Sequence, residues 1–244
     1  MNSDNTPPNL TPPILTPGMA LLLDVDGTLI DFAPTPDEVV VPPDLPDSLR
    51  SLRALLGDAL AIITGRPVSQ IDALFGDIPY AVAGEHGGLI RHAPGEAVMR
   101  GAYPPIPEDW LKRARMVIGA HPGTLLERKA NGVTLHFRKA PWAGPALRQL
   151  ADLLLAEMPS HELMSGSMVW EIRPRGIDKG GAVVALMARP PFLGRMPLFI
   201  GDDVTDEDAI RAARAMGGIG LRVDTSFGGP ADVRAWLARE AARA

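Results

Sequence analysis

The fold expected of this chain is decided by one short stretch, Met19-Ala-Leu-Leu-Leu-Asp24-Val-Asp-Gly-Thr28. Its continuous apolar run ends in acidic residues, which is typical of a strand buried on both faces of a parallel sheet. Similar runs predict strands at 59–63, 80–83 and 197–200, with helices at 48–56, 68–75, 179–189, 206–216 and 230–242. Because strands that alternate with helices form βαβ units, the sequence predicts an α/β, Rossmann-like fold with a parallel-sheet core.

The middle of the chain follows a different pattern. From about residue 104 to 174 the order is helix, two strands, helix, two strands, which predicts an antiparallel α+β insert that forms a cap. Within it, Asn131-Gly132 separates two strand-like runs, and this dipeptide is a strong hairpin signal. We therefore expect a flexible Pro-rich leader at 1–18, a catalytic core at 19–101 and 175–244, and a cap domain at 102–174.

The predicted hairpin has one polar and one apolar face. A two-residue turn at Asn131-Gly132 would place Glu127 opposite His136, and side chains alternate between the two faces of each strand. The polar set is Glu127, Lys129, Thr134, His136 and Arg138, and the apolar set is Leu126, Val133, Leu135 and Phe137. Taken alone, a solvated face explains such a polar set more often than a binding surface does.

The composition excludes several classes of protein. The 244 residues carry 24 Lys and Arg against 29 Asp and Glu, a net charge of -5, whereas nucleic-acid binders usually carry a basic surplus. The absence of cysteine excludes disulfides and thiolate metal sites. We recognise no signal peptide, and no apolar run approaches the roughly 18 residues of a membrane span. We expect a cytoplasmic, monomeric protein that binds neither nucleic acid nor membrane.

Four polar clusters carry the candidate chemistry, and three directly follow predicted strands, at the sheet edge where open α/β sheets bind ligands. In the first, Asp24 and Asp26 leave a buried strand, where acids are costly unless they are compensated. An aspartate can be a covalent nucleophile in phosphoryl transfer, and a second acid can transfer protons. A calcium loop of the EF-hand type is excluded by Leu29 and Thr35 at its Gly and Glu positions. An ordinary turn with a capping Asp stays open.

The second and third clusters are weaker signals. Thr64 and Gly65 stand between a strand and a helix, where a hydroxyl and free N–H groups can bind an anion, although Thr-Gly turns are common. Lys179 opens a helix, where its charge opposes the helix dipole. A phosphate or the nucleophile would compensate this charge, but an exposed surface lysine is an equal alternative.

The fourth cluster, Gly201-Asp-Asp-Val-Thr-Asp-Glu-Asp208, follows the strand predicted at 197–200. Mg²⁺ prefers oxygen ligands, usually one or two carboxylates together with water and substrate phosphate. Asp202 or Asp203 can therefore complete a magnesium site that Asp24 begins. The later acids, Asp206 among them, also have a structural explanation, because negative charge is favourable in the first turn of a helix.

In this order along the chain, the four clusters resemble the motifs of the haloacid dehalogenase superfamily of magnesium-dependent phosphatases. A narrower match is carried by the segments Ile63-Thr-Gly-Arg66, Ala83-Gly-Glu-His-Gly87, Glu127-x-Lys129, His136-x-Arg138, Glu171-Ile-Arg-Pro174, Lys179-Gly180 and 201–208. In these segments the chain resembles the trehalose-6-phosphate phosphatase family, and the resemblance covers nearly all of residues 20–215. Ile210 departs from the family, which commonly has Phe there, and the segment after Gly217 matches poorly.

The resemblance implies a role for each matching residue. The catalytic residues would be the nucleophile Asp24, the general acid and base Asp26, and Lys179. The phosphate would be bound by Asp24, Thr64, Gly65 and Lys179. Mg²⁺ would be held by Asp24, the main-chain carbonyl of Asp26, and Asp202, with Asp203 and Asp206 as supporting acids. The disaccharide hydroxyls would meet Glu127, Lys129, His136, Arg138 and Glu171, and less firmly Arg173. For Arg66 and His86 a loop-structuring role and a catalytic role are equal expectations.

The implied function is the magnesium-dependent hydrolysis of a small sugar phosphate, trehalose 6-phosphate, through an aspartyl-phosphate. This would be the last step of trehalose biosynthesis and would link the protein functionally to trehalose-6-phosphate synthase. Three alternatives stay open: a phosphatase for sucrose or mannosylglycerate phosphate, a sugar phosphomutase, and a catalytically silent sugar-phosphate-binding subunit. The polar cap face favours the trehalose ester, and the intact acids argue against a silent subunit.

Overall fold

The computed structural model describes residues 11–35, 38–101 and 103–244. The chain divides into two compact units. Unit 1 comprises Met1–Phe32, Val40–Val98 and Asp178–Ala244, and unit 2 comprises Ala33–Val39 and Met99–Ile177.

Unit 1 is built on a parallel sheet. Within unit 1 the strand order is β11-β10-β1-β2-β3-β4, in which β11, β10, β1, β2 and β3 are parallel and β4 is antiparallel to β3. These strands are β1 Met19–Leu23, β2 Leu60–Ile63, β3 Ala81–Gly84, β4 Leu89–Arg91, β10 Met196–Gly201 and β11 Ile219–Arg222. The two-residue strand β5, Met99–Arg100, falls at the start of the segment Met99–Ile177 of unit 2. Every residue of β1, β2 and β3 is buried, which explains their continuous apolar runs. The predicted α/β fold is confirmed.

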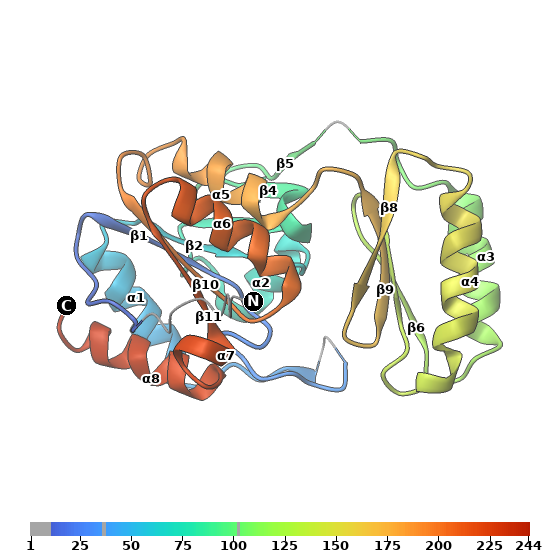
Figure 1. Ribbon diagram of the computed structural model, residues 1–244, viewed down its shortest axis with the longest axis horizontal. Coiled ribbons are helices and arrows are strands. Elements are labelled where there is room, and N and C mark those ends of the chain that lie inside the picture. The colour runs from blue at the N-terminus through green and yellow to red at the C-terminus, as the bar shows by residue number, and fades with distance from the viewer. Residues whose placement is uncertain (1–10, 36–37, 102) are drawn as a thin grey trace, which may run out of the picture. The chain divides into compact units, whose positions relative to one another are not determined.

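Helices cover this sheet on both sides (Figure 1). Those of unit 1 are α1 Leu45–Leu55, α2 Val68–Phe75, α5 Lys179–Met187, α6 Glu207–Ala215, α7 Val223–Ser226 and α8 Pro230–Ala241. Helix α1 packs against α8 on one side, and α5 packs against α6 on the other. From β1 the chain proceeds to β2, and from β10 it proceeds to β11 in the opposite direction along the sheet. The carboxyl ends of β1 and β10 therefore form the switch point at which α/β sheets bind ligands.

The chain before β1 is held by hydrogen bonds to the rest of unit 1 at Leu15, Pro17 and Gly18. Leu15 is buried, and its backbone N–H donates to the Glu240 Oε2 of α8 over 2.8 Å. These three residues lie in the leader that the sequence predicts over 1–18. Residues 1–10 lie outside the described part of the chain.

Unit 2 is a four-stranded antiparallel sheet with two helices. The strand order is β6-β7-β9-β8, with β6 Leu125–Arg128, β7 Val133–His136, β8 His161–Gly166 and β9 Val169–Pro174. Helices α3, Glu108–Gly119, and α4, Gly144–Leu155, pack against these strands. The core between them includes Trp110, Leu111, Val133, Leu135, Leu147, Leu154 and Ile172. The helix and strand order is the one that the sequence predicts.

The predicted hairpin register is wrong. Arg128 lies opposite Val133 and Leu125 opposite His136, so the turn is longer than the dipeptide Asn131-Gly132. A two-residue type I′ turn needs positive φ at both of its central residues, and neither Asn131 nor Gly132 is among the residues with positive φ. Instead Asn131 is buried, and its Oδ1 accepts from Arg100 Nε over 2.6 Å. Because each pair shifts by an even number of residues, the two predicted faces keep their members.

Candidate active site

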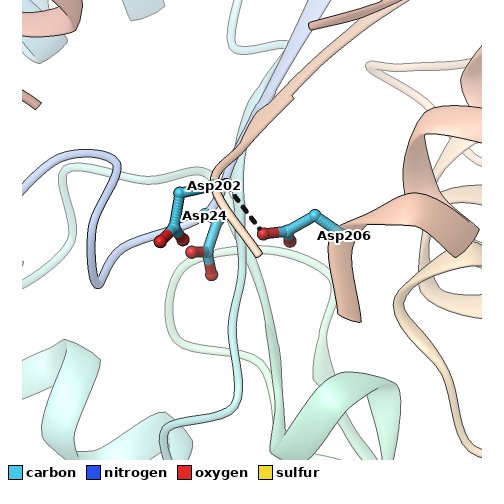
Figure 2. A group of neighbouring side chains, drawn as sticks. All are labelled: Asp24, Asp202 and Asp206. Carbon is cyan, nitrogen blue, oxygen red and sulfur yellow. Dashed lines mark hydrogen bonds between the residues drawn. The ribbon is translucent and has the colours of Figure 1, made fainter. Parts of the chain in front are cut away.

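Two acidic side chains meet at the switch point of the sheet. Asp24 follows β1 and Asp202 follows β10, and these strands are neighbours, with Leu23 opposite Ile200. Carboxylate oxygens of Asp24, Asp202 and Asp206 lie within 4.8 Å of one another. Figure 2 shows the three side chains converging from the ends of these strands and from the start of the following helix. The fold thus brings together acids that are far apart in the sequence.

Lys179 joins two of these acids. Its Nζ donates to Asp24 Oδ1 over 2.7 Å and to Asp206 Oδ1 over 2.6 Å, and the side chain is 3% exposed. Helix α5 begins at Lys179 and is capped by Asp178, whose side chain accepts the N–H of Gly181 over 2.7 Å. The capped helix start fixes the lysine beside Asp24, and an exposed surface lysine is ruled out.

Asp206 holds the loop that carries Asp202. Its Oδ2 accepts the backbone N–H of Asp202 over 2.9 Å and that of Asp203 over 3.0 Å. Asp203 in turn caps the 3₁₀ turn Val204–Asp206 by accepting the Thr205 N–H over 2.7 Å. Asp206 is fully buried and lies in the first turn of this 3₁₀ helix, where it forms a capping box with Asp203, so it also has the structural role expected of an acid at a helix start. Both of its carboxylate oxygens position other groups of the site.

The pKa values of the site reflect the crowding of these acids. Burial, then the charge of Asp206, raises the pKa of Asp24 well above its ordinary value, against the opposing effect of Lys179. Burial, together with Asp203 and Asp206, raises the pKa of Asp202 to about 7. Burial alone would lower the pKa of Lys179, but Asp24 and Asp206 raise it, so the ammonium stays charged. The cluster therefore favours a further cation.

These residues fit a magnesium ion. Asp24 and Asp202 offer carboxylate oxygens close together, and Mg²⁺ commonly takes one or two protein carboxylates. The backbone at Gly27, next to Asp26, approaches the same place, since a Cβ there would lie 2.2 Å from Asp202 Oδ2. Gly27 also has a φ of +74°, which favours glycine. A main-chain carbonyl of this loop is thus a suitable third ligand, because it offers the kind of oxygen donor that Mg²⁺ prefers.

Asp26 is held by an arginine that follows the second cluster. Arg66 Nε and Nη2 donate to the two Asp26 carboxylate oxygens, each over 2.7 Å. The backbone N–H of Arg66 also donates to Thr64 Oγ1 over 3.2 Å, so the β2 loop and the Asp26 loop are tied together. At Gly65 a Cβ would lie 2.8 Å from the His86 ring, which explains the glycine. Motif spacing could not show that Arg66 pairs with Asp26.

The polar face of unit 2 carries two paired sets of side chains. Lys129 Nζ lies 2.9 Å from Glu171 Oε1, and His136 Nε2 lies 2.8 Å from Glu127 Oε2. Burial would raise the pKa of Glu127, but the hydrogen bond from His136 and the charge of Lys129 lower it below its ordinary value. Outside these pairs, Arg138 donates to Ser167 and Arg173 to Glu162. One of the two pairs, Lys129 with Glu171, is buried, which differs from an ordinary solvated surface.

Sequence reasoning missed one basic residue near the acids, Arg222 at the end of β11. Its guanidinium donates to the backbone carbonyls of Asp202 and Asp203. The strand was not predicted, because its four residues, Ile219-Gly-Leu-Arg222, give only a short apolar signal. Only the pairing of β11 with β10 brings Arg222 to the loop.

The parallel sheet and its helices have the fold of haloacid dehalogenase-like proteins, one of which, from Bacteroides thetaiotaomicron, matches with a TM-score of 0.61 at 13% identity, over 91% of this chain and 98% of that chain. The solved C-terminal domain of trehalose-6-phosphate phosphatase from C. albicans has this fold, with a TM-score of 0.77 over 93% of each chain at 21% identity. Within this class, residues 22–237 match the model of the trehalose-phosphatase family, and the chain belongs to that family.

Two curated relatives extend the likeness in sequence. The chain is 36% identical over 239 residues to trehalose-6-phosphate phosphatase of Escherichia coli, covering 95% of this chain and 90% of that protein. It is 32% identical over 203 residues to a bifunctional trehalose-6-phosphate synthase/phosphatase of Thermoproteus tenax, covering 79% of this chain and 27% of that protein. Among the helices of the described residues, none is long and apolar enough to cross a membrane.

Proposed function

We propose that this protein hydrolyses trehalose 6-phosphate to trehalose and phosphate through an aspartyl-phosphate on Asp24. The observation that carries the proposal is the contact of Lys179 with Asp24 over 2.7 Å, beside the acids Asp202 and Asp206. A buried aspartate held by a lysine at a strand end suits covalent phosphoryl transfer. The substrate is inferred from the family and from the relatives named above.

In the first step a carboxylate oxygen of Asp24 attacks phosphorus while the bond from phosphorus to the sugar oxygen breaks. Asp26 gives its proton to that leaving oxygen. In the second step Asp26 takes a proton from water, the water oxygen attacks phosphorus, and phosphate leaves with the Asp24 carboxylate restored. Lys179 keeps a positive charge beside the nucleophile throughout. Thr64 and Gly65 would supply a hydroxyl and an N–H to the phosphoryl oxygens.

Asp24, Asp202 and the main-chain carbonyl of Asp26 would hold Mg²⁺. The ion would neutralise phosphoryl charge and align the phosphate with the nucleophile. Positioning and charge neutralisation together account for most of the catalysis of phosphoryl transfer. The chain's own contribution is to keep Asp202 in place through Asp206 and to keep Asp26 oriented through Arg66.

Unit 2 is proposed as the cap that determines substrate specificity. Its polar face offers the acceptors Glu127 and Glu171 and the donors Lys129, His136 and Arg138, which suit the many hydroxyl groups of a disaccharide. The pairing of Lys129 with Glu171 orients both groups before a sugar binds. We also propose that the enzyme acts in the cytoplasm as a monomer on the product of a trehalose-6-phosphate synthase, a link supported by the bifunctional relative.

The covalent step is tested by trapping. Wild type and Asp24→Asn are mixed with trehalose 6-phosphate and Mg²⁺, quenched within milliseconds and reduced with borohydride, which converts an aspartyl-phosphate to homoserine. Mass spectrometry should find homoserine at position 24 in the wild type only, and Asp24→Asn should lose about a thousandfold or more of kcat. Asp31→Asn is the matched control, because Asp31 is an exposed acid of the same loop, paired with Arg234.

Asp24→Asn should keep its fold, as judged by circular dichroism and the thermal midpoint. Homoserine at another position, or appreciable turnover by Asp24→Asn, would show that the nucleophile is misassigned. Turnover by wild type without any trapped homoserine under conditions that accumulate the intermediate would count against the covalent route.

A further inference from the structure

Arg222 makes five hydrogen bonds, one for each N–H of its guanidinium. Two go to the backbone carbonyls of Asp202, over 2.8 Å, and Asp203, over 3.3 Å. The other three go to carboxylates: Glu207 Oε1 over 2.8 Å and both oxygens of Asp224 over 3.1 Å each. The side chain starts beside the loop, because Arg222 lies opposite Gly201 in the pairing of β11 with β10.

The loop between β10 and α6 is therefore held from two sides. Asp206 accepts the N–H groups of Asp202 and Asp203, and Arg222 donates to the carbonyl groups of the same two residues. Fixing both polar groups of each residue leaves their backbone little freedom to rotate. A carboxylate carried on such a loop is oriented before a ligand arrives, which lowers the entropic cost of binding.

The charge of Arg222 is already balanced within this arrangement. Its hydrogen bonds with Asp224 and Glu207 raise its own pKa, and they lower that of Asp224 below its ordinary value. The paired oxygens of Asp224 also fix the plane of the guanidinium, as bidentate contacts do. Arg222 therefore acts on the loop mainly through its directed hydrogen bonds to the two carbonyls, and less through its charge.

We propose that Arg222 is a positioning residue of the metal site, which sets the affinity for a divalent cation by holding the backbone of Asp202. The proposal rests on the magnesium site of the proposed function, in which Asp202 is a ligand. Removing a residue that hydrogen-bonds to a metal ligand typically lowers metal affinity or activity about 10- to 100-fold.

A positioning role and a purely electrostatic role of Arg222 predict opposite changes in cation affinity when Arg222 is replaced. Arg222 is a cation near an acidic cluster, so by Coulomb's law alone its removal should tighten the binding of another cation. If Arg222 positions Asp202, its removal should weaken binding. Lysine at this position keeps the charge but offers one ammonium in place of the planar fork, so it cannot make all five contacts.

The test is a direct titration of metal-free protein with Mn²⁺, followed by electron paramagnetic resonance, with Mg²⁺ as competitor. Wild type is compared with Arg222→Gln, Arg222→Lys and Arg211→Gln. Arg211 is the matched control, because it lies on α6 and pairs with the half-buried Asp208 instead of with the loop carbonyls. Metal-free thermal midpoints and the dependence of kcat on Mg²⁺ are measured alongside.

We expect Arg222→Gln to bind Mn²⁺ about tenfold or more weakly than wild type, Arg222→Lys to lie between them, and Arg211→Gln to match wild type. Saturating Mg²⁺ should restore most of kcat in Arg222→Gln, because the lesion is in metal affinity. If Arg222→Gln does not fold, the proposal is tested by whether Arg222→Lys binds Mn²⁺ more weakly than wild type. Unchanged or tighter binding by the Arg222 variants would overturn the proposal. Wild type that binds no Mn²⁺ would instead overturn the metal site of the proposed function.

Discussion

Asp24, Asp202 and Asp206 show how costly this site is for the fold. The chain gathers three carboxylates within 4.8 Å around the single ammonium of Lys179. Buried like charges destabilise a folded protein unless they bind protons or cations. The raised pKa values of Asp24 and Asp202 show that their ionised forms are destabilised in the folded protein, and a bound divalent cation would stabilise them.

This cost predicts how stabilisation by Mg²⁺ depends on pH. In the metal-free protein, burial and the neighbouring acids Asp203 and Asp206 raise the pKa of Asp202 to about 7, above the value of 3.8 expected when unfolded. Its stabilising contribution is therefore complete below about pH 4 and is lost as the pH rises through 7. Mg²⁺ needs the ionised carboxylate, so the rise in thermal midpoint on adding Mg²⁺ should be larger at pH 8 than at pH 6.

Differential scanning fluorimetry with and without Mg²⁺ across this range makes the comparison. Asp202→Asn is the control and should lose most of the metal response at both pH values. An equal rise at pH 6 and pH 8 in the wild type would contradict the assignment of Asp202 as a ligand.

At the scale of elements, the buried strands could be predicted from sequence, and the contacts between strands could not. The apolar run before Asp24 has few alternatives to a buried strand, and the acids that follow it fall at a sheet edge by topology alone. The pairs of Asp26 with Arg66 and of Asp202 with Arg222 depend on neighbouring strand order and loop paths. No spacing along the chain carries that information.

The hairpin of unit 2 shows the same limit. The turn chemistry of Asn131-Gly132 predicted a two-residue turn, but tertiary contacts of Asn131 with Arg100 and His161 produce a longer one. The alternation of side chains was more reliable than the turn, because an even shift in register keeps every residue on its face. The face on which Glu127 and His136 lie was therefore predictable, but the residues opposite them in the ladder, Thr134 and Leu125, were not.

This polar face makes a prediction about specificity. Lys129→Ala should raise KM for trehalose 6-phosphate about tenfold or more while changing KM for an aryl phosphate little, because a lost charge-assisted hydrogen bond costs about 1.5–3 kcal/mol. Arg128→Ala is the matched control, since Arg128 is the neighbouring basic residue and is largely exposed. Steady-state kinetics with both esters give the comparison.

Equal increases in KM for the two esters would remove Lys129 from the specificity site. The substitution also leaves the buried Glu171 without its lysine, which can destabilise unit 2. If Lys129→Ala fails to fold, the double variant Lys129→Met with Glu171→Gln removes the pair without stranding a charge and carries the same expectation.

At the scale of the whole molecule, the two units divide the proposed work. Unit 1 holds Asp24, Lys179 and the acidic loops, and unit 2 holds the polar face. Phosphoryl transfer depends on unit 1, whereas the choice of sugar depends on unit 2 in this account. Chemistry and selectivity should therefore be separable by measurement.

The most direct measurement is phosphate release from trehalose 6-phosphate, with and without Mg²⁺, beside sucrose 6-phosphate, glucose 6-phosphate and an aryl phosphate. We predict release that requires Mg²⁺, with kcat/KM for trehalose 6-phosphate well above the values for the other three esters. Comparable turnover of all four esters would keep the phosphatase chemistry and contradict the role of unit 2. No release from any of them would contradict the proposal that this protein is a sugar-phosphate phosphatase.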